Sequence, residues 1–101
     1  MTRTVDVKAE ERELHRRDEL IKALEFGIVG ALQSQGIDFL GFALRYEEFN
    51  CLLTVKADRN GERYVAFVGS DTIMNCFLKA QSAARHGSLR WRPDQYHQKD
   101  V

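Results

Sequence analysis

The chain has 101 residues and a mass of 11.6 kDa, which suits one domain and leaves no room for two independent cores. A hydrophobic fraction of 44%, a charged fraction of 30% and a single proline exclude a disordered, collagen-like or disulfide-scaffold chain. No apolar run approaches the roughly 20 residues of a membrane span, and residues 1–6 lack the apolar stretch of a signal peptide. We therefore expect a soluble, cytoplasmic protein without membrane contact.

The charges cancel over the whole chain but are unevenly distributed. Residues 1–71 hold ten basic against thirteen acidic residues, a net charge of −3, whereas residues 72–101 hold five against two, a net charge of +3. The protein as a whole has no net charge to attract a polyanion. Any contact with nucleic acid is therefore expected at the C-terminal end.

Cysteine and histidine usage gives no sign of a metal or cofactor site. The two cysteines, Cys51 and Cys76, are 25 residues apart, with no C-x-x-C pair and no histidine at ligand spacing. We predict that both are reduced, buried hydrophobic residues. A cross-link between them is the alternative in an oxidising compartment.

The first predicted element is a helix from residue 8 to residue 35. Its apolar residues recur at steps of three, four and seven: Leu14, Ile21, Leu24, Ile28 and Leu32. Gly36 supplies the C-terminal stop. Such a helix is about 42 Å long and overhangs an eight-residue strand of about 26 Å. The highly charged residues 1–12 are thus predicted to form either a solvated, partly frayed arm or a surface that meets a second copy.

Two glycines interrupt the apolar half of this helix. Gly27 and Gly30 each cost roughly 1 kcal/mol inside a helix relative to alanine. Either they allow a close approach of another backbone, or they break the helix.

Three strands follow, at residues 37–46, 50–57 and 62–69, with an Asn60-Gly61 turn between the last two. Strict alternation in the first strand places Leu40, Phe42, Leu44 and Tyr46 on one face, and Ile37, Phe39, Gly41 and Ala43 on the other. In the second strand the inward residues are Cys51, Leu53, Val55 and Ala57. The short connections predict an antiparallel meander.

The last helix is predicted to begin after Ser70 or Asp71, either of which can cap it, and to end at Gly87. Its apolar stripe comprises Ile73, Phe77, Ala80 and Ala84, with Met74 and Leu78 beside it. Residues 88–92 are either a short edge strand or an ordered segment, since Pro93 is expected to stop any ladder. Residues 93–101 are expected to form a C-terminal tail.

These elements predict a single α+β domain of order αβββα, with a three-stranded antiparallel meander packed against two helices and room for a short fourth strand. The order is similar to that of the double-stranded RNA-binding domain. That family carries a basic cluster at the start of its last helix. Here the same place reads Ser70-Asp71-Thr72-Ile73-Met74, with no base before Lys79. The resemblance covers element order alone, so it does not imply RNA binding.

No catalytic set is predicted. Nucleophilic catalysis needs a serine or cysteine beside a positioned base, but His15 lies in the charged N-terminal half of the first helix, His97 in the tail and His86 at a helix end. The acidic pairs at residues 10–11 and 47–48 are expected to be solvated. The turn at residues 69–72 is expected to be a helix cap, with an anion site as the alternative.

The least ordinary segment is basic and aromatic, and its candidate partner-binding residues are Arg90, Trp91, Arg92 and Tyr96. The favoured interpretation is that Leu89 and Trp91 pack on the domain's own core while both arginines face water, with partner recognition as the second role of Trp91. The function favoured by the sequence is a non-enzymatic protein-interaction or regulatory module acting as a homodimer, with another protein as a further partner. The first alternative is a nucleic-acid-associated protein using residues 85–97, and the second is a small-ligand enzyme.

Overall fold

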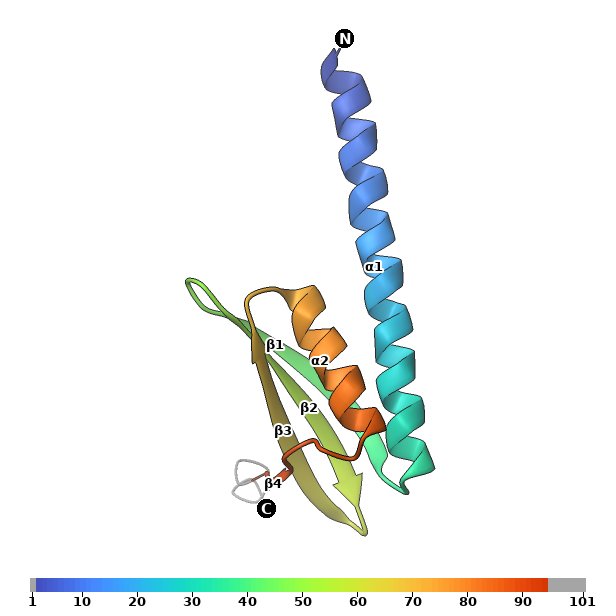
Figure 1. Ribbon diagram of the computed structural model, residues 1–101, viewed down its shortest axis with the longest axis vertical. Helices are drawn as coiled ribbons and strands as arrows, with labels where there is room; N and C mark the ends of the chain where they lie inside the picture. Colours follow the sequence, from blue (N-terminus) through green and yellow to red (C-terminus); the bar gives the residue numbers. More distant parts are fainter. Residues whose placement is uncertain (1, 95–101) are drawn as a thin grey trace.

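A computed structural model describes the backbone of residues 2–94 and the side chains of residues 18–94. The elements, in chain order, are α1 (Thr2–Ser34), β1 (Asp38–Tyr46), β2 (Cys51–Arg59), β3 (Glu62–Ser70), α2 (Ile73–Arg85) and β4 (Arg92–Pro93) (Figure 1). The predicted α+β fold of order αβββα is confirmed, and a short fourth strand is present. No helix among these residues is long and apolar enough to cross a membrane.

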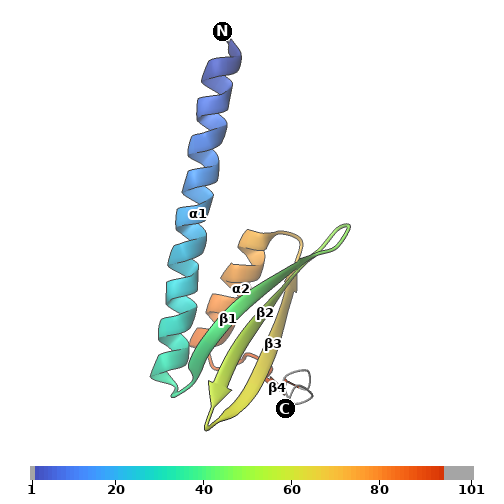
Figure 2. The same cartoon turned by 180° about the vertical axis from the view of Figure 1, so that it is seen from behind.

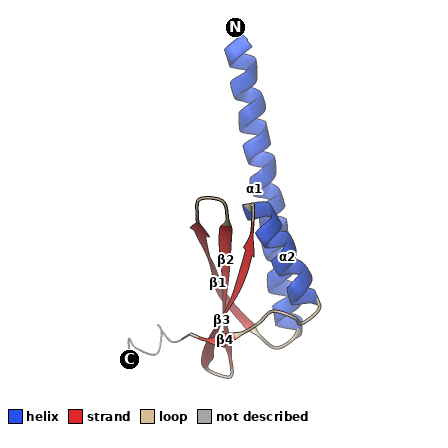
Figure 3. Ribbon diagram, turned by 60° about the vertical axis from the view of Figure 1, so that its left-hand side comes forward, coloured by secondary structure: helices blue, strands red, loops and turns tan. Residues whose placement is uncertain are grey.

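The sheet is antiparallel throughout, with strand order β1-β2-β3-β4. Both helices lie on the same face of the sheet, which leaves the opposite face without a covering helix (Figures 2 and 3). β4 pairs Arg92 with Val65 and Pro93 with Tyr64. Pro93 is the last residue of this strand, so the ladder ends at the proline as expected, although the proline is itself paired. Proline is tolerated in an edge strand, where its missing N–H leaves no neighbouring strand unpaired.

The core lies between β2 and the two helices. The predicted inward face of β2 is confirmed, and the residues buried with it come from α1, from α2 and from Ile37 just before β1. The principal members are Ile28, Leu32, Leu53, Val55, Phe77 and Ala80. Both cysteines are free and buried, as predicted. The Cys76 thiol donates a hydrogen bond to the Cys51 carbonyl oxygen at 3.3 Å.

Positive φ angles occur at the turns that the sequence marks. Asn60 and Gly61 have φ values of 57° and 82°, as a two-residue type I′ hairpin requires. Gly36 follows α1 with a φ of 74°, and Gly87 follows α2 with a φ of 64°. Both helices thus end at a glycine in the left-handed region, as predicted.

β1 departs from the predicted alternation. A register shift between Phe39 and Gly41 places an extra residue, Leu40, opposite the junction between Lys56 and Ala57. Because a bulge reverses the side-chain order of the residues before it, Phe39 joins Phe42 on the face that meets the helices. Their rings lie with centroids 4.5 Å apart. The prediction that these two residues occupy opposite faces is wrong.

The start of α2 also differs from prediction. The N-cap is Thr72, whose side-chain oxygen accepts a hydrogen bond from the Asn75 backbone N–H at 3.1 Å. Asp71 instead accepts side-chain hydrogen bonds from Ser70 and Asn75. Cys76 belongs to the buried stripe, and Leu78 lies outside it with 46% of its surface exposed.

α1 is one continuous helix of 33 residues, about 50 Å long, and its N-terminal half extends beyond the sheet (Figure 1). It begins at Thr2, earlier than the predicted residue 8. Neither glycine breaks it. A Cβ at Gly27 would overlap the side-chain amide of Gln81 in α2, whereas a Cβ at Gly30 would meet nothing within 4 Å. Gly27 therefore marks the close approach of the two helices.

Candidate interaction surfaces

The basic-aromatic segment packs onto the body of the domain, as the favoured interpretation of the sequence predicts. Leu89 and Trp91 are partly buried against the core cluster, while Arg90 and Arg92 are exposed. Tyr96 lies outside the described residues. The structure therefore places Trp91 as a packing residue, and the proposed partner-binding role of Arg90, Trp91, Arg92 and Tyr96 stays a prediction.

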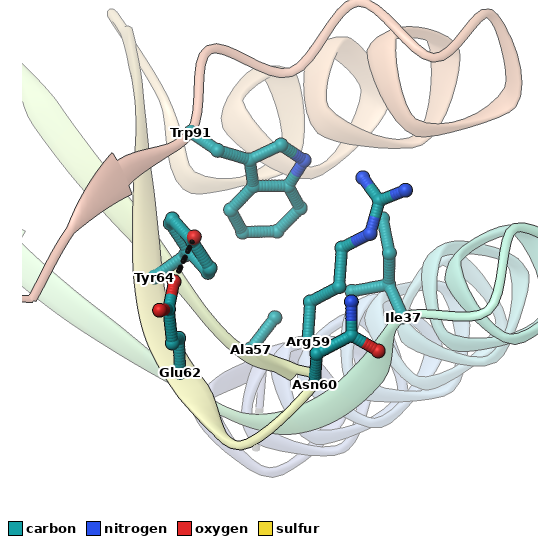
Figure 4. Close-up of a pocket in the computed structure, with 7 residues that line it drawn as sticks. All are labelled: Ile37, Ala57, Arg59, Asn60, Glu62, Tyr64 and Trp91. Atoms are coloured by element: carbon teal, nitrogen blue, oxygen red, sulfur yellow. Dashed lines mark hydrogen bonds between the residues drawn. The ribbon is translucent and has the colours of Figure 1, made fainter.

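Trp91 also forms one wall of a pocket of about 400 Å³ (Figure 4). Ile37 and Ala57 supply its buried apolar surface, and Tyr64 lies beside the indole. Polar residues from the end of the β2–β3 hairpin complete the lining: Arg59, Asn60 and Glu62. This pocket mixes aromatic surface with charges of both signs.

The pocket holds one hydrogen-bonded pair of titratable side chains. The Tyr64 hydroxyl donates a hydrogen bond to a Glu62 carboxylate oxygen at 2.6 Å. This bond and the negative charge of Glu62 raise the pKa of Tyr64 above its ordinary value. Glu62 and Arg59 are the charged residues of the lining, and none of the lining residues is a histidine, cysteine or serine.

Three other titratable residues, His86, Cys76 and Asp71, take part in hydrogen bonds that stabilise the fold. His86 is the C-cap of α2, and its Nδ1 lies 2.7 Å from the Ser82 carbonyl oxygen. Desolvation raises the pKa of the buried Cys76 thiol, which opposes formation of a reactive thiolate. Hydrogen bonds from Asn75 and Ser70 lower the pKa of Asp71. Within residues 18–94, no three histidine, cysteine, aspartate or glutamate side chains are placed to hold a metal ion.

The outer edge of β1 carries backbone groups that β2 cannot reach. Glu47 and Asn50 exchange backbone hydrogen bonds of 2.8 and 3.4 Å across the β1–β2 turn. In an antiparallel pair, hydrogen-bonded and non-hydrogen-bonded positions alternate. Counting back from Glu47 along the register, Arg45 and Ala43 bond to β2. The N–H and C=O groups of the intervening residues, Phe42, Leu44 and Tyr46, therefore point outward, where the described residues provide no further strand.

Large apolar side chains surround this free edge. Leu40, Leu44 and Tyr46 of β1 are 45%, 39% and 67% exposed, and Phe26 of α1 is 78% exposed. Between α1 and β1 runs a groove of about 360 Å³, lined by Glu25, Phe26, Val29, Phe39, Gly41 and Phe42. The free edge and the groove together form one surface, which we call the β1 edge surface.

Sequence reasoning identified the apolar character of both faces of β1 but missed Phe26. This residue lies outside the helical stripe formed by Ile21, Leu24 and Ile28, on the side of α1 that a polar residue usually occupies. A large aromatic residue outside the apolar stripe of a helix could have indicated an exposed interaction surface at Phe26.

Comparisons with known proteins give no further guide to function: no protein-family model matches the chain, and neither a curated protein nor a solved structure is significantly similar to it.

Proposed function

We propose that the protein is a non-enzymatic interaction module that acts as a homodimer, and that the β1 edge surface is its interface. The observation that carries the proposal is the row of outward backbone groups at Phe42, Leu44 and Tyr46. A strand edge of this kind is a template for another strand. The exposed apolar side chains beside it add area that a partner can remove from water.

The composition of β1 supports this choice of edge. Residues 39–44 contain no charge and no proline, although edge strands that avoid pairing usually carry such residues. At the other side of the sheet, β4 includes Pro93 and covers only Tyr64 and Val65 of β3. The β1 edge differs in that no described strand pairs with it at any point and that exposed apolar side chains lie beside it.

A second copy of the chain is the partner that best fits this edge. Antiparallel pairing of a strand with itself has two-fold symmetry, and two-fold dimers are the commonest oligomers. A net charge of zero gives little electrostatic repulsion between copies. A strand from a different protein would use the same backbone groups. If the chain is monomeric in solution, such a protein is the expected partner instead of a second copy.

The test is sedimentation equilibrium of the wild type and two lysine variants. Leu44→Lys places a charge on the proposed interface, and Phe67→Lys places one on another exposed apolar residue, in β3 and away from β1. We expect wild type and Phe67→Lys at micromolar concentration to have twice the 11.6 kDa chain mass, and Leu44→Lys to be monomeric. A monomeric wild type, or a Leu44→Lys variant that remains as dimeric as wild type, would overturn the proposal.

Nucleic-acid association is the second candidate, because Arg90 and Arg92 are both exposed beside Trp91. Its test is fluorescence anisotropy of a labelled 20-nucleotide DNA strand at 50 and 200 mM salt. Phosphate-dominated binding weakens steeply with salt and requires the arginines. Binding that is absent at 50 mM salt, or unchanged in an Arg90→Ala, Arg92→Ala variant, would exclude it.

A further inference from the structure

We infer that two copies pair through β1 with Leu44 opposite the partner's Leu44, so that Tyr46 of each copy enters the groove between α1 and β1 of the other. This inference rests on the proposed dimer and deepens it. It specifies the register of the interface and the residue that each copy contributes to the other's groove.

The register follows from the outward backbone groups. A two-fold axis at Leu44 pairs Phe42 with the partner's Tyr46 and Leu44 with its own copy. All three residues that point outward on each chain then face outward groups of the partner. An axis one residue earlier would place Tyr46 opposite the bulged Leu40, where the ladder is irregular. The axis at Leu44 is therefore the one that satisfies the most backbone groups.

The same register positions the side chains. Phe42 and Tyr46 pair with Val55 and Cys51, two buried residues of the face that meets the helices. Phe42 and Tyr46 consequently share that face. A strand added at the edge places the partner's Tyr46 beside Phe42 on the helix side, which is where the groove lies.

The groove offers chemistry that suits a tyrosine. Phe42 forms an aromatic cluster with Phe39 at 4.5 Å and with Phe77 at 5.3 Å between ring centroids. An incoming ring extends this cluster, and such aromatic pairs are favourable beyond their buried area. Phe26 supplies the outer wall, and the Glu25 carboxylate is an acceptor for the phenol hydroxyl. Two residues that are largely exposed in the single chain, Phe26 and Tyr46, become covered together.

A cysteine scan tests the register. Cα atoms of a hydrogen-bonded antiparallel pair are about 5.5 Å apart, within the range that a disulfide spans. Leu44→Cys is expected to form a covalent dimer on mild oxidation, while Ala43→Cys and Tyr46→Cys, each opposite a different residue, are not. The native thiols of Cys51 and Cys76 are buried in the single chain. The wild type treated with the same oxidant therefore measures how much covalent dimer forms without an introduced cysteine.

The outcomes separate the register from the dimer itself. If the wild type is dimeric by sedimentation but Ala43→Cys forms the covalent dimer and Leu44→Cys does not, the inferred register would be overturned and the dimer proposal would stand. A monomeric wild type would overturn both. Dimerisation of the full chain without cross-linking at any of the three positions would also contradict pairing at this part of β1.

A double-mutant cycle tests occupancy of the groove. Phe26→Ala and Tyr46→Ala are each expected to raise the dimer dissociation constant about tenfold, and the double variant to raise it little further, because each substitution removes the same contact. Leu78→Ala, at an exposed leucine on α2, is the matched control and should leave the constant within twofold. Fully additive effects of Phe26→Ala and Tyr46→Ala would contradict a shared contact.

Discussion

The rings of Phe39 and Phe42 contact each other in a tilted arrangement, with centroids 4.5 Å and planes 50° apart, because the bulge at Leu40 turns both side chains towards the helices. Phe42 in turn meets Phe77 of α2 edge-on at 5.3 Å. This aromatic cluster joins the edge strand to the helical layer. It therefore contributes both to the stability of the domain and to the floor of the groove beside α1.

The cluster predicts a graded loss of stability at residue 42. Phe42→Ala is expected to lower the free energy of unfolding by about 2–3 kcal/mol, less than the roughly 3–5 kcal/mol of a fully buried phenylalanine, since Phe42 is only partly buried. Phe42→Leu should lower the free energy of unfolding by about half as much as Phe42→Ala. Urea unfolding measures both, and equal stabilities of wild type and Phe42→Ala would show that the cluster contributes nothing.

The single tryptophan is predicted to be a packing residue. Trp91→Ala removes partly buried aromatic surface from the core cluster and should cost about 2–3 kcal/mol. Arg90→Ala and Arg92→Ala change exposed residues and should each stay within about 0.5 kcal/mol of wild type. Chemical unfolding followed by circular dichroism compares all three, and a Trp91→Ala variant of unchanged stability would place the ring outside the core.

The two helical glycines are predicted to respond differently to alanine. At Gly30 a Cβ meets nothing within 4 Å, so Gly30→Ala should stabilise the protein by about 0.5–1 kcal/mol through helix propensity. At Gly27 a Cβ displaces the Gln81 side chain, so Gly27→Ala should gain less. Thermal unfolding at one protein concentration compares the stabilities of the two variants. A Gly30→Ala variant less stable than Gly27→Ala would contradict the prediction.

Thr72 is predicted to be the residue that caps α2. Thr72→Ala removes the acceptor of the Asn75 N–H and should cost about 1 kcal/mol. Thr72→Ser retains the hydroxyl and should recover most of that loss. The matched variant is Ser70→Ala, which leaves the cap in place and should cost less than Thr72→Ala. If urea unfolding showed a larger loss of stability for Ser70→Ala than for Thr72→Ala, Ser70 would be the capping residue.

The parts of the fold that sequence predicts well depend on local chemistry. The alternation of β2, the Asn60-Gly61 turn and the helix stops at Gly36 and Gly87 each follow from side-chain pattern or from tolerance of positive φ. The β1 bulge does not follow, because strict two-residue periodicity cannot indicate where an extra residue enters. The sequence predicted the wrong N-cap for α2, because Ser70, Asp71 and Thr72 all have side chains that can cap a helix. Only the backbone geometry selects Thr72.

The candidate surface was only partly predictable for a similar reason. The alternation of Leu89 and Trp91 with exposed arginines is readable in sequence and is present in the structure. The β1 edge surface brings residue 26 next to residues 39 and 42, and this contact depends on how α1 crosses β1. No periodicity within one element contains that information.

The most direct measurement of the proposed interface is backbone amide exchange in β1 at two protein concentrations, resolved by residue. We predict that the amides of Phe42, Leu44 and Tyr46 are protected at high concentration and lose protection on dilution, because only a partner strand can bond them. The amides of Ala43 and Arg45, which bond to β2, should stay protected at both concentrations. Equal, fast exchange at Phe42, Leu44 and Tyr46 at every concentration would contradict the account.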